Sequence, residues 1–375
     1  MNSLRNNLPK KIKVAIGATF EDFGGVARYI HEIRKFSSYD VTEIPSQRLV
    51  DFLSRAFLSY RMTSGKKDNP YDILMENIDL RRIYQRFMKT VRLNGYDIAH
   101  SQSNKWFTNA CLNSRNNLSG WIHTYHSLYA FEEDFPQGLM KWQINANKEL
   151  LEIAPKADVR ISVSHWLHDY LEEKYDIQTI VIPNGVDIDA CNVARSQDFI
   201  ERYRIKDFIL FVGYISEVKN PSLFIELASM MPEKKFVMIG RGLQQESLKT
   251  VYDGSLPSNI IPLGELNHSD TLNAMSASKI LVMTSKREGL PTVLLEAMSL
   301  GKPTVAPAHT GCKEVIHDDR FGFLFEPDSL DDLEKKTRIA LESSAVGENA
   351  RERVRMNYNM KTLVSKIDDI YASLM

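Results

Sequence analysis

The sequence predicts an α/β protein with two doubly wound, Rossmann-like halves. An apolar run at 13–17 leads into a glycine pair and then into apolar residues at helical spacing as far as Phe36, which is typical of a strand, a loop and a helix. The same order restarts at 208–213, where Asn220, expected to cap the next helix, and Pro221, at its first position, precede a second helical stripe. The 375 residues are enough for about two to three domains, each with its own core.

Short apolar runs alternate with helical patterns through both halves, as expected for parallel sheets covered by helices. A proline and an Asn-Gly pair at 182–187 suit a connection between the halves. We therefore expect a first domain at 1–190, a second at 191–350, and terminal helices at 351–375 that pack back across both. The expected strands are 13–17, 97–100, 121–125 and 160–164 in the first half, and 208–213, 235–239, 260–263, 280–284, 304–306 and 321–325 in the second.

Composition excludes several classes of protein. The 47 basic and 48 acidic residues leave a net charge of −1, so the chain has no field to hold a polyanion and no nucleic-acid partner is expected. Cys111, Cys191 and Cys312 are far apart without a CxxC pair, which predicts neither disulfides nor a zinc site. No secretory signal core or run of 18 apolar residues occurs, so a cytoplasmic protein is expected.

One segment departs from this even distribution of charge. Residues 79–92 combine an apolar face with five lysine or arginine residues and, after Asp79, no acidic residue, which predicts a basic amphipathic helix. Such a helix either packs on the sheet with a solvated basic face or makes peripheral contact with the inner face of a membrane or with a phosphorylated acceptor.

Loops that follow strands are where doubly wound sheets bind ligands, and two of them carry candidate anion sites. Gly24 and Gly25 open a helix whose free backbone N–H groups can receive a phosphate, although tight packing of the loop on the strand explains a glycine pair equally well. Lys219, in the loop 213–219, is placed to neutralise a diphosphate; the alternative is an ordinary solvated lysine.

A third loop carries two carboxylates, Glu288 and Glu296, eight residues apart. If a helix begins near Pro291, its first N–H groups suit a diphosphate. Because carboxylates repel phosphate, these two are expected to accept hydrogen bonds from the vicinal hydroxyls of sugars. For Glu296 the alternative is a favourable position in the field of the helix dipole.

Together these segments resemble the retaining GT-B glycosyltransferases of family 4 (glycosyl transferases group 1), which include many cell-surface polysaccharide and lipid-linked sugar transferases. The most specific segment, 288–298 with 301–303, resembles the E-x7-E motif of that family, and 310–314 resembles its G-G-x-x-E. The resemblance covers most of the chain and implies the GT-B fold, in which two Rossmann-like domains, acceptor-side and donor-side, face a central cleft. Its other segments are 23–29, 124–126, 162–164, 182–187, 211–213 with Lys219, 239–242 and 263–264.

The resemblance also implies roles for the candidate residues. Glu288, Lys219 and His126 would be catalytic: Glu288 and His126 would contact the donor sugar, and Lys219 would stabilise the leaving diphosphate. Glu296 would hold the ribose, and Gly24 and Gly25 would line the acceptor side and approach the phosphate. The remaining donor-binding candidates are Gly289, Leu290, Pro291, Thr292 and Val293 along the sugar and diphosphate, and Gly213, Tyr214, Arg241, Gly264 and Glu265 around the nucleotide.

The reaction implied is retaining transfer of a hexose-type sugar from a UDP- or GDP-sugar to a glycan or lipid-linked acceptor. No bound cofactor and no essential metal are expected. The departure from the family is Tyr214, where most relatives have an arginine; either the leaving group is less stabilised, or Arg287 or Arg241 supplies the cation. Two alternatives remain: a nucleotide-sugar epimerase of the same fold, and a non-catalytic two-lobed sugar- or nucleotide-binding protein.

Other motifs are weaker. Asp187 and Asp189 have the DxD form of metal-dependent transferases, but turn chemistry explains them in their Asn-Gly context. The His-x-x-His pairs at 123–126 and 165–168 lack a third ligand at zinc spacing, so packing or substrate contact is the better interpretation.

Overall fold

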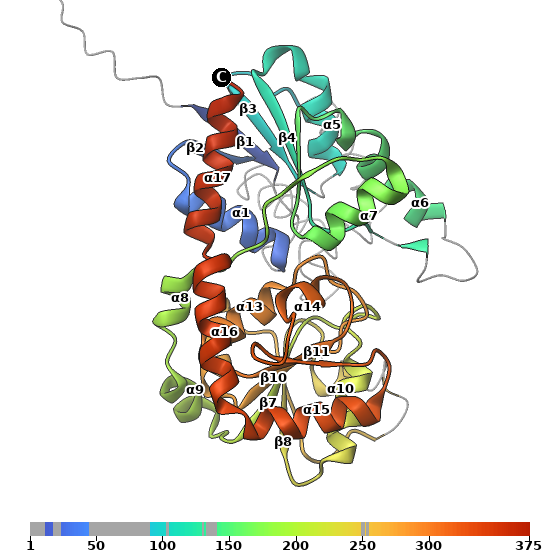
Figure 1. The fold of residues 1–375 in the computed structure, drawn as a ribbon, viewed down its shortest axis with the longest axis vertical. Helices are drawn as coiled ribbons and strands as arrows, with labels where there is room; N and C mark the ends of the chain where they lie inside the picture. Colours follow the sequence, from blue (N-terminus) through green and yellow to red (C-terminus); the bar gives the residue numbers. More distant parts are fainter. Residues whose placement is uncertain are drawn as a thin grey trace, which may run out of the picture. The chain divides into compact units, whose positions relative to one another are not determined.

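Two parallel six-stranded sheets organise the chain, which confirms the predicted α/β class (Figure 1). The computed structural model describes residues 12–17, 24–44, 91–102, 105–129, 131–132, 141–248, 252 and 255–375. They form two compact units. The first contains the described residues up to Val163, residues 168–182 and 364–375, and the second contains 164–167 and 183–363.

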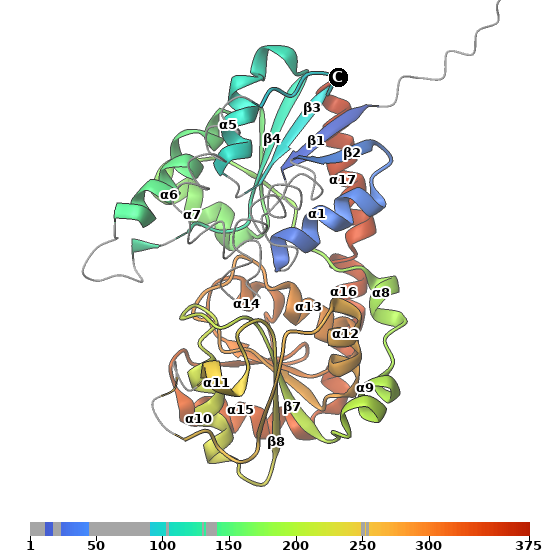
Figure 2. The ribbon, with the colours of Figure 1, turned by 180° about the vertical axis from the view of Figure 1, so that it is seen from behind.

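The first unit has the strand order β2-β1-β3-β4-β5-β6, with every pair parallel. Helices α1 and α17 lie on one side of this sheet and α5 and α6 on the other (Figures 1 and 2). The strands are β1 (Lys13–Gly17), β2 (Asp40–Ile44), β3 (Ile98–Ser101), β4 (Gly120–Tyr125), β5 (Val159–Ser162) and β6 (Ile180–Val181). The helices are α1 (Gly25–Phe36), α5 (Lys105–Asn113), α6 (Lys141–Glu152), α7 (His165–Tyr175) and α17 (Met360–Ser373), the last two shared with the second unit at their N-termini.

The second unit has the order β12-β11-β10-β7-β8-β9, again all parallel. The chain runs outward from β7 to β9 and then returns to β10 on the other side of β7. The carboxyl ends of β7 and β10 therefore form a switch point, where such sheets bind ligands. The strands are β7 (Phe208–Val212), β8 (Lys235–Ile239), β9 (Ile260–Gly264), β10 (Ile280–Val282), β11 (Thr304–Pro307) and β12 (Phe323–Phe325).

Helices cover both faces of the second sheet as well (Figure 2). The aromatic rings of Phe211, Phe224 and Phe236 lie in the core between β7, β8 and α10, with neighbouring ring centres 5.3 Å apart. The helices are α8 (Ile188–Asn192), α9 (Ser196–Tyr203), α10 (Pro221–Met230), α11 (Gln245–Leu248), α12 (His268–Ala277), α13 (Thr292–Ser299), α14 (Thr310–Val315), α15 (Leu330–Glu342) and α16 (Ser344–Asn357).

Several expectations concern features outside the sheets. The basic segment 79–92 lies outside the described residues as far as residue 90. Within the part of the chain that the structure describes, no helix is long and apolar enough to cross a membrane. All three cysteines are buried free thiols, in agreement with the expected absence of disulfides.

Candidate active site

Three glycine-containing turns follow β7, β8 and β9 and hold one another by backbone hydrogen bonds. Gly213 N–H donates to the carbonyl of Ile239 at 3.0 Å, and Gly240 N–H donates to the carbonyl of Gly264 at 2.8 Å. Gly240 adopts φ +143°, and a methyl group on it would lie 1.8 Å from the carbonyl oxygen of Gly213. Side chains are therefore excluded at the point where the β7 and β8 turns touch, and the Gly213 turn is fixed before it reaches Lys219.

Gly240→Ala is expected to lower the free energy of unfolding by about 4 kcal/mol, because it combines a backbone clash with an unfavourable φ. Urea denaturation measures the change. The matched control is Gly264→Ala, which also requires a positive φ of +70°, but there the atoms nearest to the added methyl group belong to the flexible side chain of Gln244, the closest at 3.1 Å. The control is expected to lose about 1–2 kcal/mol. An equal loss in both variants would show that the contact between the two turns is unimportant.

Lys219 and Glu288, from the loops after β7 and β10, form an ion pair at the switch point. The Nζ of Lys219 donates to Oε1 of Glu288 at 2.6 Å, and the side chains are only 20% and 12% exposed. Burial by itself would lower the pKa of Lys219, but the charge and hydrogen bond of Glu288 outweigh it, so the pKa is raised. The ammonium group therefore stays charged, and two of its three N–H donors remain for a further anion.

The backbone around this pair is held by a threonine from each side. The hydroxyl of Thr284, just after β10, donates to the carbonyls of Lys219 and Asn220 at 3.1 and 2.7 Å. Asn220 precedes α10, as predicted, but it adopts a left-handed conformation and its side chain makes no cap hydrogen bond, so the expected capping role is wrong. Glu288 N–H in turn donates to the hydroxyl of Thr310 at 3.2 Å.

Gly311, in the segment that resembles G-G-x-x-E, completes this support. Its N–H donates to the carbonyl of Glu288 at 3.1 Å, and a methyl group here would lie 2.2 Å from the carbonyl oxygen of Gly289. The first turn of α14 thus packs directly against the backbone that follows Glu288, which explains why glycine occupies position 311.

Helix α13 begins at Thr292, with Pro291 as the residue before it, close to the predicted start. The first N–H groups of such a helix, including those of Thr292 and Val293, have no acceptor within the helix and remain available to an anion. The loop before it is fixed by Asn184, whose side-chain N–H donates to the carbonyl of Leu290 at 3.1 Å. Sequence reasoning did not single out Asn184, although it lies in the Asn-Gly segment.

Glu296 lies one turn into α13 and is 9% exposed. Its Oε1 accepts a hydrogen bond from Nε2 of His268, at the start of α12, at 2.6 Å. Sequence reasoning missed His268, because a histidine at the start of a helix carries no motif. Glu296 is thus held by a side-chain partner from another helix, and its position in the helix dipole is only one part of its environment.

The remaining donor-side candidates lie on the same turns. Tyr214 is 42% exposed, and the Lys219 ammonium lies 5.7 Å from its ring centre. The carbonyl of Arg241 accepts a hydrogen bond from Ile215 at 2.9 Å, and Glu265 is exposed after β9. The structure therefore places Gly213, Tyr214 and Lys219 on one turn and Arg241 on the turn bonded to it.

Arg287 was one of the two predicted substitutes for the missing arginine. Its guanidinium lies 5.9 Å from the ring centre of Trp166, a residue of the same unit, at a distance typical of a cation–π contact. Tyr214, which stands where the resemblance predicts an arginine, contacts the Lys219 ammonium through the face of its aromatic ring.

His126, the first-unit candidate, lies just after β4 and is 8% exposed. Its Nε2 lies 2.7 Å from Oε1 of Gln102, and its ring packs edge-on against Tyr29 at 4.7 Å between centres. Since an amide oxygen only accepts, Nε2 carries the proton and Nδ1 keeps a lone pair. Burial lowers the pKa of His126 to about 3, so the ring is neutral near pH 7. Gln102 was not predicted.

Gly24 and Gly25 open α1 as predicted. Gly24 has φ +90°, and among the described residues no atom lies within 4 Å of where its Cβ would be. The positive φ therefore accounts for Gly24 better than tight packing does. Both glycines are exposed at the N-terminus of a helix.

The weaker motifs have structural explanations. Asp187 caps α8 by accepting from Ala190 N–H at 3.1 Å, which is the turn chemistry expected for it. His123 Nδ1 lies 2.7 Å from the Ser101 hydroxyl in the core, and His168 Nδ1 lies 2.9 Å from the hydroxyl of Thr179.

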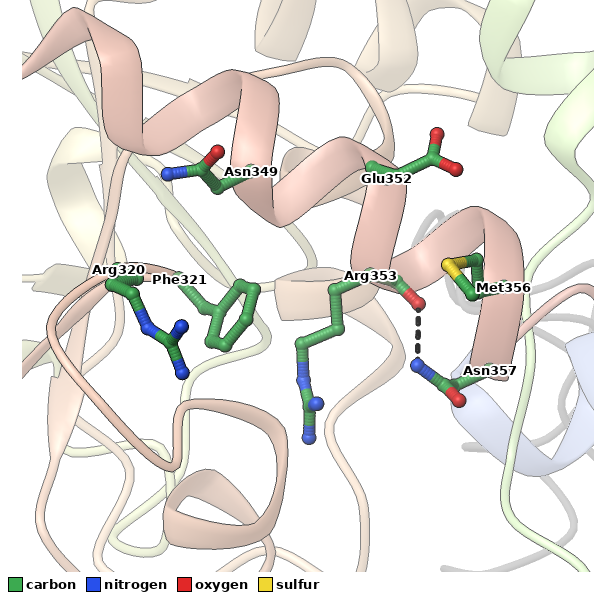
Figure 3. Close-up of a pocket in the computed structure, with 7 residues that line it drawn as sticks. All are labelled: Arg320, Phe321, Asn349, Glu352, Arg353, Met356 and Asn357. Carbon is green, nitrogen blue, oxygen red and sulfur yellow. Dashed lines mark hydrogen bonds between the residues drawn. The ribbon is translucent and has the colours of Figure 1, made fainter.

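A surface hollow of about 320 Å³ lies beside α16 and contains none of the candidate residues (Figure 3). The guanidinium of Arg353 donates to the carbonyls of Glu314 and Val315 at 3.2 and 3.1 Å and lies 5.0 Å from the ring centre of Phe321. This arginine thus joins α16 to the end of α14. The hollow is lined by Arg320, Phe321, Asn349, Glu352, Arg353, Met356 and Asn357.

Two family models match the chain, one in each half. The model described as Glycosyltransferase Family 4 matches residues 58–190, and the model described as Glycosyl transferases group 1 matches residues 195–362. Between them they span most of the sequence, including every donor-side candidate residue and His126.

Several proteins of similar sequence are named as glycosyltransferases. An Escherichia coli UDP-Gal:alpha-D-GlcNAc-diphosphoundecaprenol alpha-1,3-galactosyltransferase is 28% identical, covering 76% of this chain and 78% of that protein. An uncharacterized glycosyltransferase of Methanocaldococcus jannaschii is 24% identical over 97% of this chain and 99% of its own.

Solved structures share the fold along the chain. Sucrose-phosphate synthase from Thermosynechococcus elongatus has a TM-score of 0.72 and 20% identity, covering 97% of this chain and 99% of its own. The Anabaena protein HepE, solved with UDP-glucose, has a TM-score of 0.69 and 17% identity, covering 96% of this chain and all of its own. The family models, the named relatives and the two doubly wound sheets agree: the chain belongs to the family 4 glycosyltransferases and is a transferase enzyme of the GT-B fold.

Proposed function

We propose that this enzyme transfers a hexose-type sugar from a UDP-sugar to a lipid-linked glycan acceptor, with retention of configuration and without an essential metal ion. The observation that carries the proposal is the Lys219–Glu288 pair at the switch point of the second sheet, with Glu296 one turn into the helix that follows. This arrangement offers a cation, helix N–H groups and two carboxylates, which suit the diphosphate and the hydroxyl groups of a nucleotide-sugar.

The positively and negatively charged side chains would bind different parts of the donor. Lys219, charged and with N–H donors to spare, would meet the diphosphate together with the free N–H groups at the start of α13. Glu288 would accept hydrogen bonds from sugar hydroxyls, and Glu296 would accept those of the ribose. A fixed cation next to the leaving group supplies the charge stabilisation that some transferases take from a metal ion.

The chemical step that we propose takes place on one face of the sugar. The acceptor hydroxyl oxygen bonds to the anomeric carbon as the bond from that carbon to the diphosphate breaks, and the leaving phosphate oxygen takes the hydroxyl proton. Glu288 is a poor nucleophile because its charge is engaged by Lys219 at 2.6 Å, which supports a mechanism without a covalent sugar–enzyme intermediate. His126, neutral near pH 7, would contact the sugar as a hydrogen-bonding group.

The choice of substrates is supported by the relatives. The Escherichia coli relative is named for a UDP-sugar donor and a diphosphoundecaprenol-linked acceptor. A Campylobacter jejuni relative, 26% identical over 41% of this chain, is named for a diNAcBac-PP-undecaprenol-linked glycan acceptor. We therefore favour UDP over GDP, and we propose that the basic segment 79–92 brings the enzyme to the inner face of the membrane that holds such an acceptor.

Thermal shift with UDP, GDP, ADP and their sugar conjugates tests the donor. UDP at about 100 times its Kd is expected to add roughly 2.7 kcal/mol and to raise the melting temperature by several degrees. EDTA should leave that shift unchanged. Glu296→Ala should abolish it, because the ribose loses its acceptor, whereas Glu348→Ala on the exposed surface of α16 should retain it.

The other outcomes are equally informative. A shift with GDP and none with UDP would contradict the proposed nucleotide. Loss of the UDP shift in EDTA would contradict metal independence. No shift with any nucleotide or nucleotide-sugar would contradict donor binding at this site.

A further inference from the structure

We propose that His268 is a positioning residue for the nucleotide ribose: by holding Oε1 of Glu296, it fixes the carboxylate in the orientation that receives the 2′- and 3′-hydroxyl groups. The inference rests on the proposed function, because it takes Glu296 as the residue that accepts hydrogen bonds from the ribose. It adds a residue that the motifs of the sequence do not indicate.

The two side chains form a short hydrogen bond that is largely shielded from solvent on the Glu296 side. Nε2 of His268 lies 2.6 Å from Oε1 of Glu296, with the histidine 35% exposed and the carboxylate 9% exposed. Among the described residues, His268 is the side chain that the structure shows hydrogen-bonded to Glu296. A carboxylate with so little water around it depends on this partner for its orientation.

The histidine is itself firmly placed. It is the first residue of α12, directly after the cap residue Asn267. Asn267 accepts from Asp270 N–H at 2.8 Å, and its side-chain N–H donates to the Asp270 carboxylate at 3.0 Å. These two bonds close the first turn of α12, so the ring of His268 is presented to α13 from a fixed backbone.

The pairing leaves room for the ribose. A carboxylate has about four lone-pair sites, of which Nε2–H uses one, and a vicinal diol needs two. A neutral imidazole is sufficient, since Nε2–H donates while Nδ1 keeps its lone pair. His268 therefore orients the Glu296 carboxylate and still leaves enough of its lone pairs for the two ribose hydroxyl groups. A contact that only joined α12 to α13 would not distinguish a ribose with hydroxyl groups from one without them.

The test compares the affinities for UDP and for 2′,3′-dideoxy-UDP by isothermal titration calorimetry. Wild-type protein is expected to prefer UDP strongly, and Glu296→Ala to lose that preference. His268→Ala should weaken UDP binding by about tenfold while leaving dideoxy-UDP binding unchanged. His268→Gln, whose side-chain N–H can replace Nε2–H, should recover most of the loss.

His317→Ala is the matched control. His317 forms another histidine–carboxylate pair in the same unit, with Nε2 3.3 Å from Asp318 and 47% of its side chain exposed. Its substitution should leave both affinities as in the wild type. An equal loss of UDP and dideoxy-UDP affinity in His268→Ala would reduce the contact to a helix–helix link and overturn the proposal.

Two further outcomes separate this inference from the proposed function. If wild-type protein binds UDP and Glu296→Ala loses the preference, but His268→Ala keeps it in full, the role of His268 is refuted and donor binding at Glu296 stands. If wild-type protein does not bind UDP, both are refuted.

Discussion

Replacing Glu288 by glutamine is expected to lower kcat/KM for sugar transfer by about 10³-fold, equivalent to roughly 4 kcal/mol of transition-state stabilisation. Glutamine keeps the shape of the side chain but removes the charge that accepts hydrogen bonds from sugar hydroxyls. It also leaves the ammonium of Lys219, only 20% exposed, without its anionic partner.

The effect should be confined to the sugar. Because Glu288 is assigned to the sugar and Glu296 to the ribose, the Kd for UDP is expected to change by no more than about threefold, well under 1 kcal/mol. Steady-state kinetics with a UDP-sugar, combined with calorimetry of UDP, separates the two. A large loss of UDP affinity would instead place Glu288 at the nucleotide.

The chain contains a matched control for this experiment. Glu217 and Lys286 form a second ion pair between the same two loops, at 3.1 Å, in which the acidic residue lies in the first loop and the basic residue in the second. This pair is exposed to solvent: Glu217 is 84% exposed and Lys286 46% exposed. An exposed pair of this kind contributes little, so Glu217→Gln should keep kcat/KM within about twofold. Near-normal transfer by Glu288→Gln, or an equal loss in Glu217→Gln, would refute the assignment.

The strands were predictable from the sequence wherever both of their faces are buried. Such strands are continuous apolar runs, and the predicted segments 13–17 and 235–239 coincide with β1 and β8. The two strands that were missed, β2 and β6, lie at the two edges of the first sheet. β2 has no fully buried residue and β6 has only two residues, so neither leaves the hydrophobic pattern that identifies a central strand.

The residues of the candidate site could be predicted one by one from the sequence. Which of them contact one another could not. Lys219 and Glu288 each lie in a recognisable loop, yet their contact depends on β10 returning to lie beside β7, and strand order is not a local property of the sequence. His268 and Gln102 were missed for the same reason. Each meets its partner through neighbouring elements of the fold, and neither has a local sequence feature that marks it.

The second large effect is expected in acid, because the first sheet buries three histidines in its core. The structure gives His100 and His123 no exposed surface and His126 only 8%. His100 is held by the hydroxyls of Tyr371 and Thr124, at 2.7 and 2.8 Å. Burial lowers the pKa of His100 and of His126 to about 3, with the neighbouring His126 contributing for His100, and it lowers the pKa of His123 well below its usual range.

The sign of the effect follows from where the protons bind. Well above pH 6.5 these rings are neutral in both the folded and the unfolded state and contribute no pH dependence. Below it the unfolded chain binds protons that the folded protein excludes, so stability falls with pH until the folded pKa near 3 is reached. From pH 7.5 to 5.5 His100 and His126 are each expected to remove about 1.4 kcal/mol, about 3 kcal/mol together, and His123 adds to the loss in the same direction.

Urea denaturation at the two pH values measures this loss, and His100→Gln isolates one ring. Glutamine can meet both hydroxyls without titrating, so over that interval the variant should lose about 1.4 kcal/mol less than the wild type, whatever its stability at pH 7.5. Identical losses in wild type and His100→Gln would mean that His100 has the same pKa in the folded protein as in the unfolded chain. The conclusion that burial keeps His100 neutral in the folded protein would then be disproved.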